Sequence, residues 1–342
     1  MRELRSQVVV ITGASSGLGR EAAVQFARRG CQLVLAARRE QALQETQRLC
    51  EQAGGGARCY VMDVTREQEV QDLAAYALEQ FGRIDVWVNN AGVTFFGLLD
   101  ETPFDEHRRV IETNLFGAMF GARAVIPVFR RQRRGVLINV GSILSKIGQA
   151  FVPSYVVSKF GVRGLSEALR VELADYPEVH VCTLFPYAVD TQHFQAGANQ
   201  VGRQALPMQP VQSPERVASA LVSLAERPRR ERHVPRYAVL GLLWHALTPR
   251  TVEQLLLAAL RRWHFAEQLE RPTVGSLYAP REQRGSVHGS RRPRVSVARF
   301  ALWASRQLIR IQARALLRTL RRVGLLAEAT PRARLICARD LP

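Results

Sequence analysis

Short apolar segments alternate with longer amphipathic segments through the first 90 residues of this chain. The apolar segments read QVVVIT, QLVLAA, ARCYVM and IDVWVNN, and segments with helical spacing at about 17–29, 40–53 and 66–81 separate them. Strands that alternate with helices predict βαβ units and a parallel sheet, because parallel neighbours need a crossover connection. We therefore expect a doubly wound α/β domain over residues 1–240.

The pattern changes beyond residue 240. Residues 249–269 predict one helix, and the connector at 271–294 is rich in Gly, Pro and Arg, which is typical of a wrapping loop or of a linker. We therefore expect a helix and connector extension over residues 241–294 and a basic amphipathic helical tail over residues 295–342. In the tail, arginines recur every fourth residue and apolar residues cluster on another side. The arginines are Arg306, Arg310, Arg314, Arg318 and Arg322, and the apolar residues are Leu302, Ile309, Ala313, Leu316, Leu320 and Val323.

Three roles are open for this tail helix. It can pack its apolar stripe on the catalytic domain or on a partner subunit. It can also lie on an anionic membrane surface, with Phe300 and Trp303 at the level of the headgroups. Nucleic acid is the least favoured partner, because no recognised binding motif accompanies the charge.

Composition limits the class of protein. The 342 residues are 47% hydrophobic and carry a net charge of +18, and arginine supplies all of the 48 basic residues except Lys146 and Lys159. No apolar run approaches the ~20 residues of a membrane span, and only six residues precede the first strand, so we expect a cytoplasmic protein without a signal peptide. Five cysteines without a CxxC pair and scattered histidines predict neither a disulfide framework nor a metal site.

A glycine-rich loop follows the first predicted strand. In TGASSGLG, the glycines are Gly13, Gly17 and Gly19, and they lie between the strand and the next helix. Glycine there allows a tight turn and a close approach of the backbone to a pyrophosphate, and the helix start offers free N–H donors. This arrangement predicts a Rossmann-type dinucleotide site.

The end of the second predicted strand indicates which dinucleotide is bound. The sequence there is AARRE, with Ala37 where an NAD site usually has an acid, followed by Arg38 and Arg39. A guanidinium suits the 2′-phosphate of NADP, so we expect NADP(H) to be preferred over NAD(H). The alternative is that both arginines only solvate the next helix.

The segment YVVSK places Tyr155 and Lys159 four residues apart, which on a helix brings them to one face. A neighbouring cation favours the phenolate, so the pairing makes Tyr155 a candidate general acid and base. The alternative is a buried tyrosine and a solvated lysine on an ordinary helix.

Taken together, TGASSGLG, NNAG at 89–92, Asn114, Ser142 and YVVSK resemble the short-chain dehydrogenase/reductase family, in its compact single-domain NADP-type branch, over residues 7–240. The resemblance implies that Tyr155 exchanges a proton with the substrate oxygen. Lys159 would lower the pKa of Tyr155 and bind the nicotinamide ribose. Ser142 would hold the substrate carbonyl, with a helix or turn cap as the alternative role, and Asn114 would hold a water that relays protons to Lys159.

The resemblance also implies a set of cofactor-binding residues. Asp63 would accept from the adenine amino group, and Asn89 would be structural. Tyr187 stands where the family usually has glycine, which puts the local backbone in question or narrows the substrate pocket. The full set is Gly13, Ser15, Ser16, Gly17, Leu18, Gly19, Arg38, Asp63, Val64, Asn90, Ala91, Gly92, Tyr155, Lys159, Pro186, Tyr187, Val189 and Thr191.

These features predict an oxidoreductase that transfers a hydride between NADP(H) and a ketone or secondary alcohol. By the same resemblance, the helices at about 104–131 and 154–175 would pair subunits into a dimer or tetramer. The loop at about 188–212 mixes amides with scattered apolar residues, and we expect it to cover the pocket. Lys146 could meet an anionic substrate or be solvated. The alternatives are a non-catalytic NADP-binding scaffold or sensor that acts through its tail, and an epimerase or dehydratase, which NNAG disfavours. The membrane alternative would place the protein on the inner face of a membrane.

Overall fold

The computed structural model describes residues 3–280, 285–291 and 295–322. Its contacts divide the chain into a first unit that ends at Val295 and a second unit that begins at Ser296. Each unit is described by itself below.

The first unit is built on a seven-stranded sheet with the order β3-β2-β1-β4-β6-β7-β10, and its neighbours all pair in parallel. The strand order reverses direction between β1 and β4, and ligands of open α/β sheets bind in the crevice at such a switch point. The predicted doubly wound sheet is thus confirmed. The strands are β1 (Val8–Thr12), β2 (Gln32–Ala37), β3 (Gly56–Val61), β4 (Val86–Asn89), β6 (Gly135–Val140), β7 (Val179–Pro186) and β10 (Glu231–Val234).

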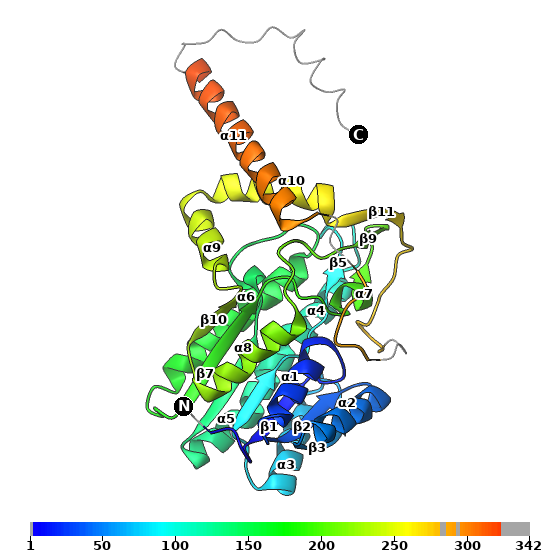
Figure 1. Cartoon of the computed structure of the whole chain (residues 1–342), viewed down its shortest axis with the longest axis vertical. Helices are drawn as coiled ribbons and strands as arrows, with labels where there is room; N and C mark the ends of the chain where they lie inside the picture. Colours follow the sequence, from blue (N-terminus) through cyan, green and yellow to red (C-terminus); the bar gives the residue numbers. More distant parts are fainter. Residues whose placement is uncertain (1–2, 281–284, 292–294, 323–342) are drawn as a thin grey trace. The chain divides into compact units, whose positions relative to one another are not determined.

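Helices cover both faces of the sheet (Figure 1). Successive residues of a strand point to opposite faces. In β1, Val9 and Ile11 pack in one core with α1, α2 and α8, whereas Val10 packs in the other core with α3, α5 and α6. The helices are α1 (Gly17–Ala27), α2 (Glu40–Gln52), α8 (Pro214–Glu226), α3 (Glu67–Phe81), α5 (Gly117–Gln132) and α6 (Pro153–Glu172).

A π-helical turn interrupts the helical segment that leads into α5. The helix α4 (Phe104–Ile111) is followed by the π turn η1 (Glu112–Phe116) and then directly by α5. Asn114 lies in the middle of this turn. Such turns are rare and occur frequently at functional sites.

The prediction of one helix over residues 249–269 was wrong. After α9 (Ala238–Leu247), the helix α10 (Pro249–Trp263) ends and β11 (Phe265–Leu269) pairs antiparallel with β9 (Arg203–Ala205). Phe265 is buried there and makes an edge-to-face contact with Phe151. This aromatic contact comes from a distant segment, so helical periodicity could not reveal it.

The described part of the connector wraps the first unit. Thr273 and Asn199 exchange two backbone hydrogen bonds of 2.8 and 2.9 Å, and the Gly17 N–H donates to the Ser286 carbonyl at 2.8 Å. Figure 1 shows this segment passing beside the short elements β5 (Phe95–Phe96) and α7 (His193–Ala196). Thr273 of the segment forms a bridge with Asn199 of β8 (Ala198–Asn199).

The second unit contains α11 (Val297–Arg322), which agrees with the helix expected in the tail. Val323 and the residues that follow it lie outside the described part of the chain. Within α11, Leu302 and Ile309 are exposed, as are Arg306 and Arg310. Among the described helices, none combines the length and the apolar character that crossing a membrane requires.

Candidate active site

The glycine-rich loop lies tightly against the segment after β4. A Cβ on Gly19 would lie 2.3 Å from the Gly13 carbonyl oxygen, so only glycine fits there. The Asn90 Nδ2 donates to the carbonyls of Thr12 and Gly13 at 3.0 and 3.2 Å. Asn90 therefore holds the loop through its side chain, and the sequence did not indicate this role.

Arg39 lies at the start of α1, whose first turn carries no acidic residue. The Arg39 Nη2 donates to the hydroxyls of Ser16 and Ser15 at 2.8 and 3.3 Å. A helix start and a nearby guanidinium suit phosphate oxygens. In this structure the Gly17 N–H of this helix start donates to the Ser286 carbonyl at 2.8 Å. The residues present therefore fit a dinucleotide, and Arg39 is a neighbour of the loop that the predicted set lacks.

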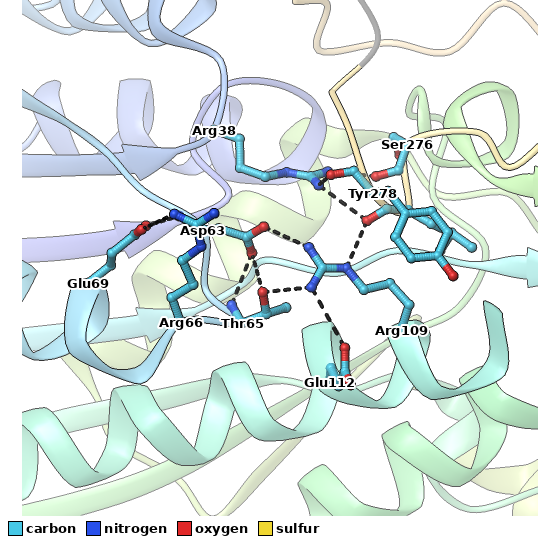
Figure 2. A network of polar contacts seen from close by, with 10 residues as sticks. Arg38, Asp63, Thr65, Arg66, Glu69, Arg109, Glu112, Ser276 and Tyr278 are labelled. Atoms are coloured by element: carbon cyan, nitrogen blue, oxygen red, sulfur yellow. Dashed lines mark hydrogen bonds and ion pairs between the residues drawn. The ribbon is translucent and has the colours of Figure 1, made fainter. Parts of the chain in front are cut away.

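A second network joins Asp63, Arg109 and Arg38 (Figure 2). The Asp63 carboxylate accepts from Arg109 Nη2 at 2.7 Å and from the Thr65 backbone N–H at 3.0 Å. Burial works to raise the pKa of Asp63, but the hydrogen bonds from Thr65 and the charges of Arg109 and Arg38 outweigh it and lower the pKa. Asp63 is therefore ionised, and one of its carboxylate oxygens is already paired with Arg109. Arg109 was not predicted as a site residue, because nothing in the sequence of α4 distinguishes it.

Tyr155 and Lys159 lie one turn apart at the start of α6. The Lys159 Nζ lies 5.6 Å from the centre of the Tyr155 ring and donates to the Val140 carbonyl at the end of β6 at 2.8 Å. Lys159 is 4% exposed, and burial lowers its pKa to about 8. The sheet thus holds the ammonium in place, whereas a solvated lysine would have no such partner.

The pKa of Tyr155 differs from the expectation. Burial raises this pKa to about 12, and the side-chain hydrogen bond with Ser142 opposes the rise. Burial outweighs any stabilisation of the phenolate by the Lys159 ammonium, which was expected to lower the pKa. At neutral pH the phenol is therefore protonated and can donate a proton.

Ser142 has the capping role that was the alternative for its position. It caps the short helix η2 (Ile143–Ser145), because its hydroxyl accepts from the Leu144 N–H at 3.1 Å. The Ser145 hydroxyl accepts from the Ser142 backbone N–H at 3.1 Å. These bonds fix the position of the Ser142 side chain, which is also hydrogen bonded with Tyr155.

Asn114 clamps the segment after β4 to α6. Its Oδ1 accepts from the Val93 N–H at 2.8 Å, and its Nδ2 donates to the Val93 carbonyl at 2.9 Å and to the Ser158 hydroxyl at 3.1 Å. Asn114, Lys159 and Thr12 line a polar cavity of about 10 Å³. This is about the size that one water molecule needs.

The loop after β7 brings further residues to Tyr155. Tyr187 does not have a positive φ, so its backbone does not need the conformational freedom of glycine. Thr191 lies against Gly17, since a Cβ on this glycine would be 3.3 Å from the Thr191 Cβ.

His193 lies next to Tyr155. The two rings are 5.6 Å apart, and burial and the Lys159 charge lower the pKa of His193 to about 4. A neutral imidazole thus faces the phenol, and the sequence did not indicate it.

Aromatic and aliphatic side chains also pack against Tyr155. Phe96 stacks on Phe194 with a centroid separation of 6.2 Å, and both belong to the apolar cluster that reaches Tyr155.

Lys146 is paired with an acidic side chain. Its Nζ lies 2.5 Å from the Glu231 carboxylate and over the Phe185 ring. Lys146 is thus held by Glu231, which argues against contact with an anionic substrate.

Comparisons with known proteins agree with this geometry. The family model described as short chain dehydrogenase matches residues 7–201. The uncharacterized oxidoreductase YxnA of Bacillus subtilis (strain 168) is 33% identical over 280 residues, which cover 80% of this chain and 77% of that protein. The chain therefore belongs to the short-chain dehydrogenase/reductase family, whose members are oxidoreductases that bind nicotinamide cofactors.

Solved structures of this family resemble the first unit. An alcohol dehydrogenase from the archaeon Thermococcus sibiricus, complexed with 5-hydroxy-NADP, matches with a TM-score of 0.60 and 29% identity, covering 67% of this chain and 96% of that one. A short chain dehydrogenase/reductase from Burkholderia phymatum in complex with NAD matches with a TM-score of 0.64 and 28% identity, covering 70% of this chain and 92% of that one. Both forms of the cofactor thus occur among similar proteins.

Proposed function

We propose that the protein is an NADP(H)-dependent oxidoreductase that interconverts a ketone and a secondary alcohol. The observation that carries the proposal is the grouping of Tyr155, Lys159 and Ser142 beside the switch point of the sheet. When bound, the nicotinamide cofactor supplies or accepts the hydride. The similar alcohol dehydrogenase with its NADP derivative supports the same class of reaction.

The side chains of this chain divide the remaining work. Tyr155 donates its proton to the carbonyl oxygen during reduction, and Ser142 donates a hydrogen bond that holds this oxygen in line. Lys159 stabilises the phenolate that forms, and the polar cavity beside Asn114 and Lys159 has room for a water that returns a proton to the site. The reverse path oxidises an alcohol with the same groups.

Two arginines support the preference for NADP(H). Arg38 and Arg39 follow β2, where an acid would bind the 2′-hydroxyl of NAD. Arg39 already reaches the hydroxyls of Ser15 and Ser16 at the glycine-rich loop. A phosphate at this place would meet guanidinium groups and hydroxyl donors rather than a carboxylate.

The test is hydride transfer over a panel of ketones and secondary alcohols, followed through NADPH absorbance. We expect Tyr155→Phe to lower kcat/KM by at least about 100-fold, because the proton donor is lost. NADPH affinity should stay near that of the wild type. Tyr76→Phe is the matched control, since it removes the hydroxyl of a tyrosine whose ring packs against Tyr60 away from the site.

Two outcomes would contradict the proposal. Turnover that Tyr155→Phe leaves unchanged would exclude the proposed proton donor. Cofactor binding without turnover on any substrate of the panel would favour the non-catalytic scaffold.

A further inference from the structure

A short segment of the extension lies against the adenine end of the proposed cofactor site. We call residues 273–278 the strap, and they follow the part of the chain that matches the family model. Thr273 pairs with Asn199, and the Ser276 N–H donates to the Ala196 carbonyl at 2.8 Å. Gly275 has a φ of +55°, and a Cβ there would lie 2.5 Å from the Ala196 carbonyl oxygen. Glycine is therefore required for the strap to lie where it does.

Three consecutive carbonyls of the strap hold Arg38. The Arg38 Nη2 donates to the Ser276 carbonyl at 2.6 Å, and Nη1 donates to the carbonyls of Leu277 and Tyr278 at 3.2 and 3.1 Å. Figure 2 shows the guanidinium pointing into this group of oxygens. The strap thus fixes the orientation of a side chain that would otherwise rotate freely.

The strap leaves part of the guanidinium available. A guanidinium has five N–H donors, and the three bonds to the strap use both protons of Nη1 and one of Nη2. Among the described residues, the Nε–H and the second Nη2 proton of Arg38 have no partner. Two adjacent donors of a guanidinium bind phosphate oxygens in a bidentate way.

The strap is itself anchored from the opposite side. The Leu277 side chain is 1% exposed and packs with Val93, Phe95 and Val110 in the cluster that reaches Tyr155. Its carbonyl accepts a second hydrogen bond, from Arg109 Nε at 3.1 Å, and Arg109 in turn pairs with Asp63. Leu277 thus connects the arginine at the end of β2 with the arginine on α4.

From these contacts we propose that the strap is a positioning element for recognition of the 2′-phosphate of NADP(H). It holds Arg38 by one part of its guanidinium so that the remaining donors meet the phosphate without further ordering. The inference rests on the proposed NADP(H) preference and extends it to a segment outside the family-matched region. It makes selectivity for NADP(H) depend on residues 273–278 as well as on Arg38.

An alternative arrangement predicts the opposite effect of the strap on NADPH binding. If the phosphate must take the place of the carbonyls, the strap competes with the cofactor, and loosening the strap would tighten NADPH binding. If the strap orders Arg38, loosening it weakens NADPH binding and leaves NADH binding unchanged. The two arrangements therefore predict opposite changes in one measured ratio.

The experiment measures dissociation constants of NADPH and NADH by fluorescence titration of the full chain. Gly275→Ala should displace the strap, and we expect it to reduce the preference for NADPH by about fivefold, because binding must then order the Arg38 side chain. Arg38→Gln should reduce the same preference by roughly 10-fold or more, because the charged donor is lost. NADH affinity should change less than twofold in both variants.

A matched control separates this effect from general strain. Gly82→Ala also places alanine at a positive φ, of +71°, but nothing lies within 4 Å of its Cβ and the residue follows α3. It should leave the preference for NADPH unchanged. Where Gly275→Ala does not fold, Leu277→Ala loosens the same strap from its buried side and should give the same loss.

The outcomes distinguish the two proposals. A wild-type preference for NADPH that Arg38→Gln abolishes, but that both strap variants retain or increase, overturns the role of the strap and leaves the NADP(H) preference standing. A wild type without preference, unaffected by Arg38→Gln, overturns both.

Discussion

Lys159 shows how a residue of the proposed active site can destabilise the fold. Its ammonium is buried at the end of β6 with the Val140 carbonyl as hydrogen-bond partner, and burial lowers its pKa from 10.5 to about 8. The charge therefore destabilises the folded protein at neutral pH, where both states carry it. An arginine in this place would stay charged at any working pH and would bring a broader donor group into the same buried space.

This arrangement predicts a pH dependence of stability. Between pH 8 and 10.5 the unfolded state holds a proton on Lys159 that the folded state has released, so the free energy of unfolding rises with pH. The shift corresponds to roughly 3 kcal/mol, and Lys159→Met lacks this contribution. We expect the difference in unfolding free energy, wild type minus Lys159→Met, to increase by most of that amount over this range.

Urea unfolding of both proteins at several pH values measures this difference. Taking the difference removes the cysteines and other tyrosines, which both proteins share and whose raised pKa values act in the opposite direction. A difference that stays constant from pH 7.5 to 10.5 would contradict a buried, destabilising ammonium.

At the scale of elements, local pattern and distant packing contribute differently. The helix α1, the strands β1 and β2 and the helix α6 agree with the periodicity and the glycine signals of their own residues. The division between α10 and β11 does not, because Phe265 is placed by its contact with Phe151. The π turn η1 could not be predicted from local sequence either, because hydrogen bonds with Val93 and Ser158 hold Asn114 there.

The helix α11 has no assigned role. Its exposed residues predict that it binds anionic membranes. Leu302 and Ile309 are 57% and 66% exposed, and Arg306 and Arg310 are exposed as well. Apolar burial and attraction to anionic lipid both favour binding of such a helix. We expect the full chain to sediment with vesicles that contain about a third phosphatidylserine more than a chain ending at residue 295 does.

Vesicles of neutral lipid serve as the control for the charge. Equal sedimentation of the two chains would contradict a role of α11 in membrane binding.

At the scale of the whole molecule, one side of the sheet leaves apolar residues exposed. Phe116, Met119, Val157 and Phe160 are each more than 40% exposed, and they lie on η1, α5 and α6. Members of this family commonly oligomerise. We infer that this surface pairs with a second copy, as the predicted roles of the segments at 104–131 and 154–175 suggested.

Light scattering after size exclusion tests the pairing. We expect the wild type to be a dimer or tetramer at micromolar concentration and Phe160→Asp to give a smaller species, because a buried charge without a partner destabilises an interface. Leu247→Asp, at an 82% exposed position of α9, should leave the mass unchanged. A monomeric wild type, or a Phe160→Asp variant of unchanged mass, would contradict the inferred surface.

The order of strands and helices, the glycine-rich loop and the placing of Tyr155 and Lys159 on one face of a helix could be read from the chain, because each depends on neighbouring residues or on a repeating period. Ser142 was found through the resemblance to the family. The pairing of Asp63 with Arg109 and the carbonyls that hold Arg38 could not. Arg38 and Ser276 are 238 residues apart, and their meeting depends on how β11, the strap and the loop after β7 pack together. Long-range packing therefore sets the surroundings of Arg38, whereas local pattern sets its place at the end of β2.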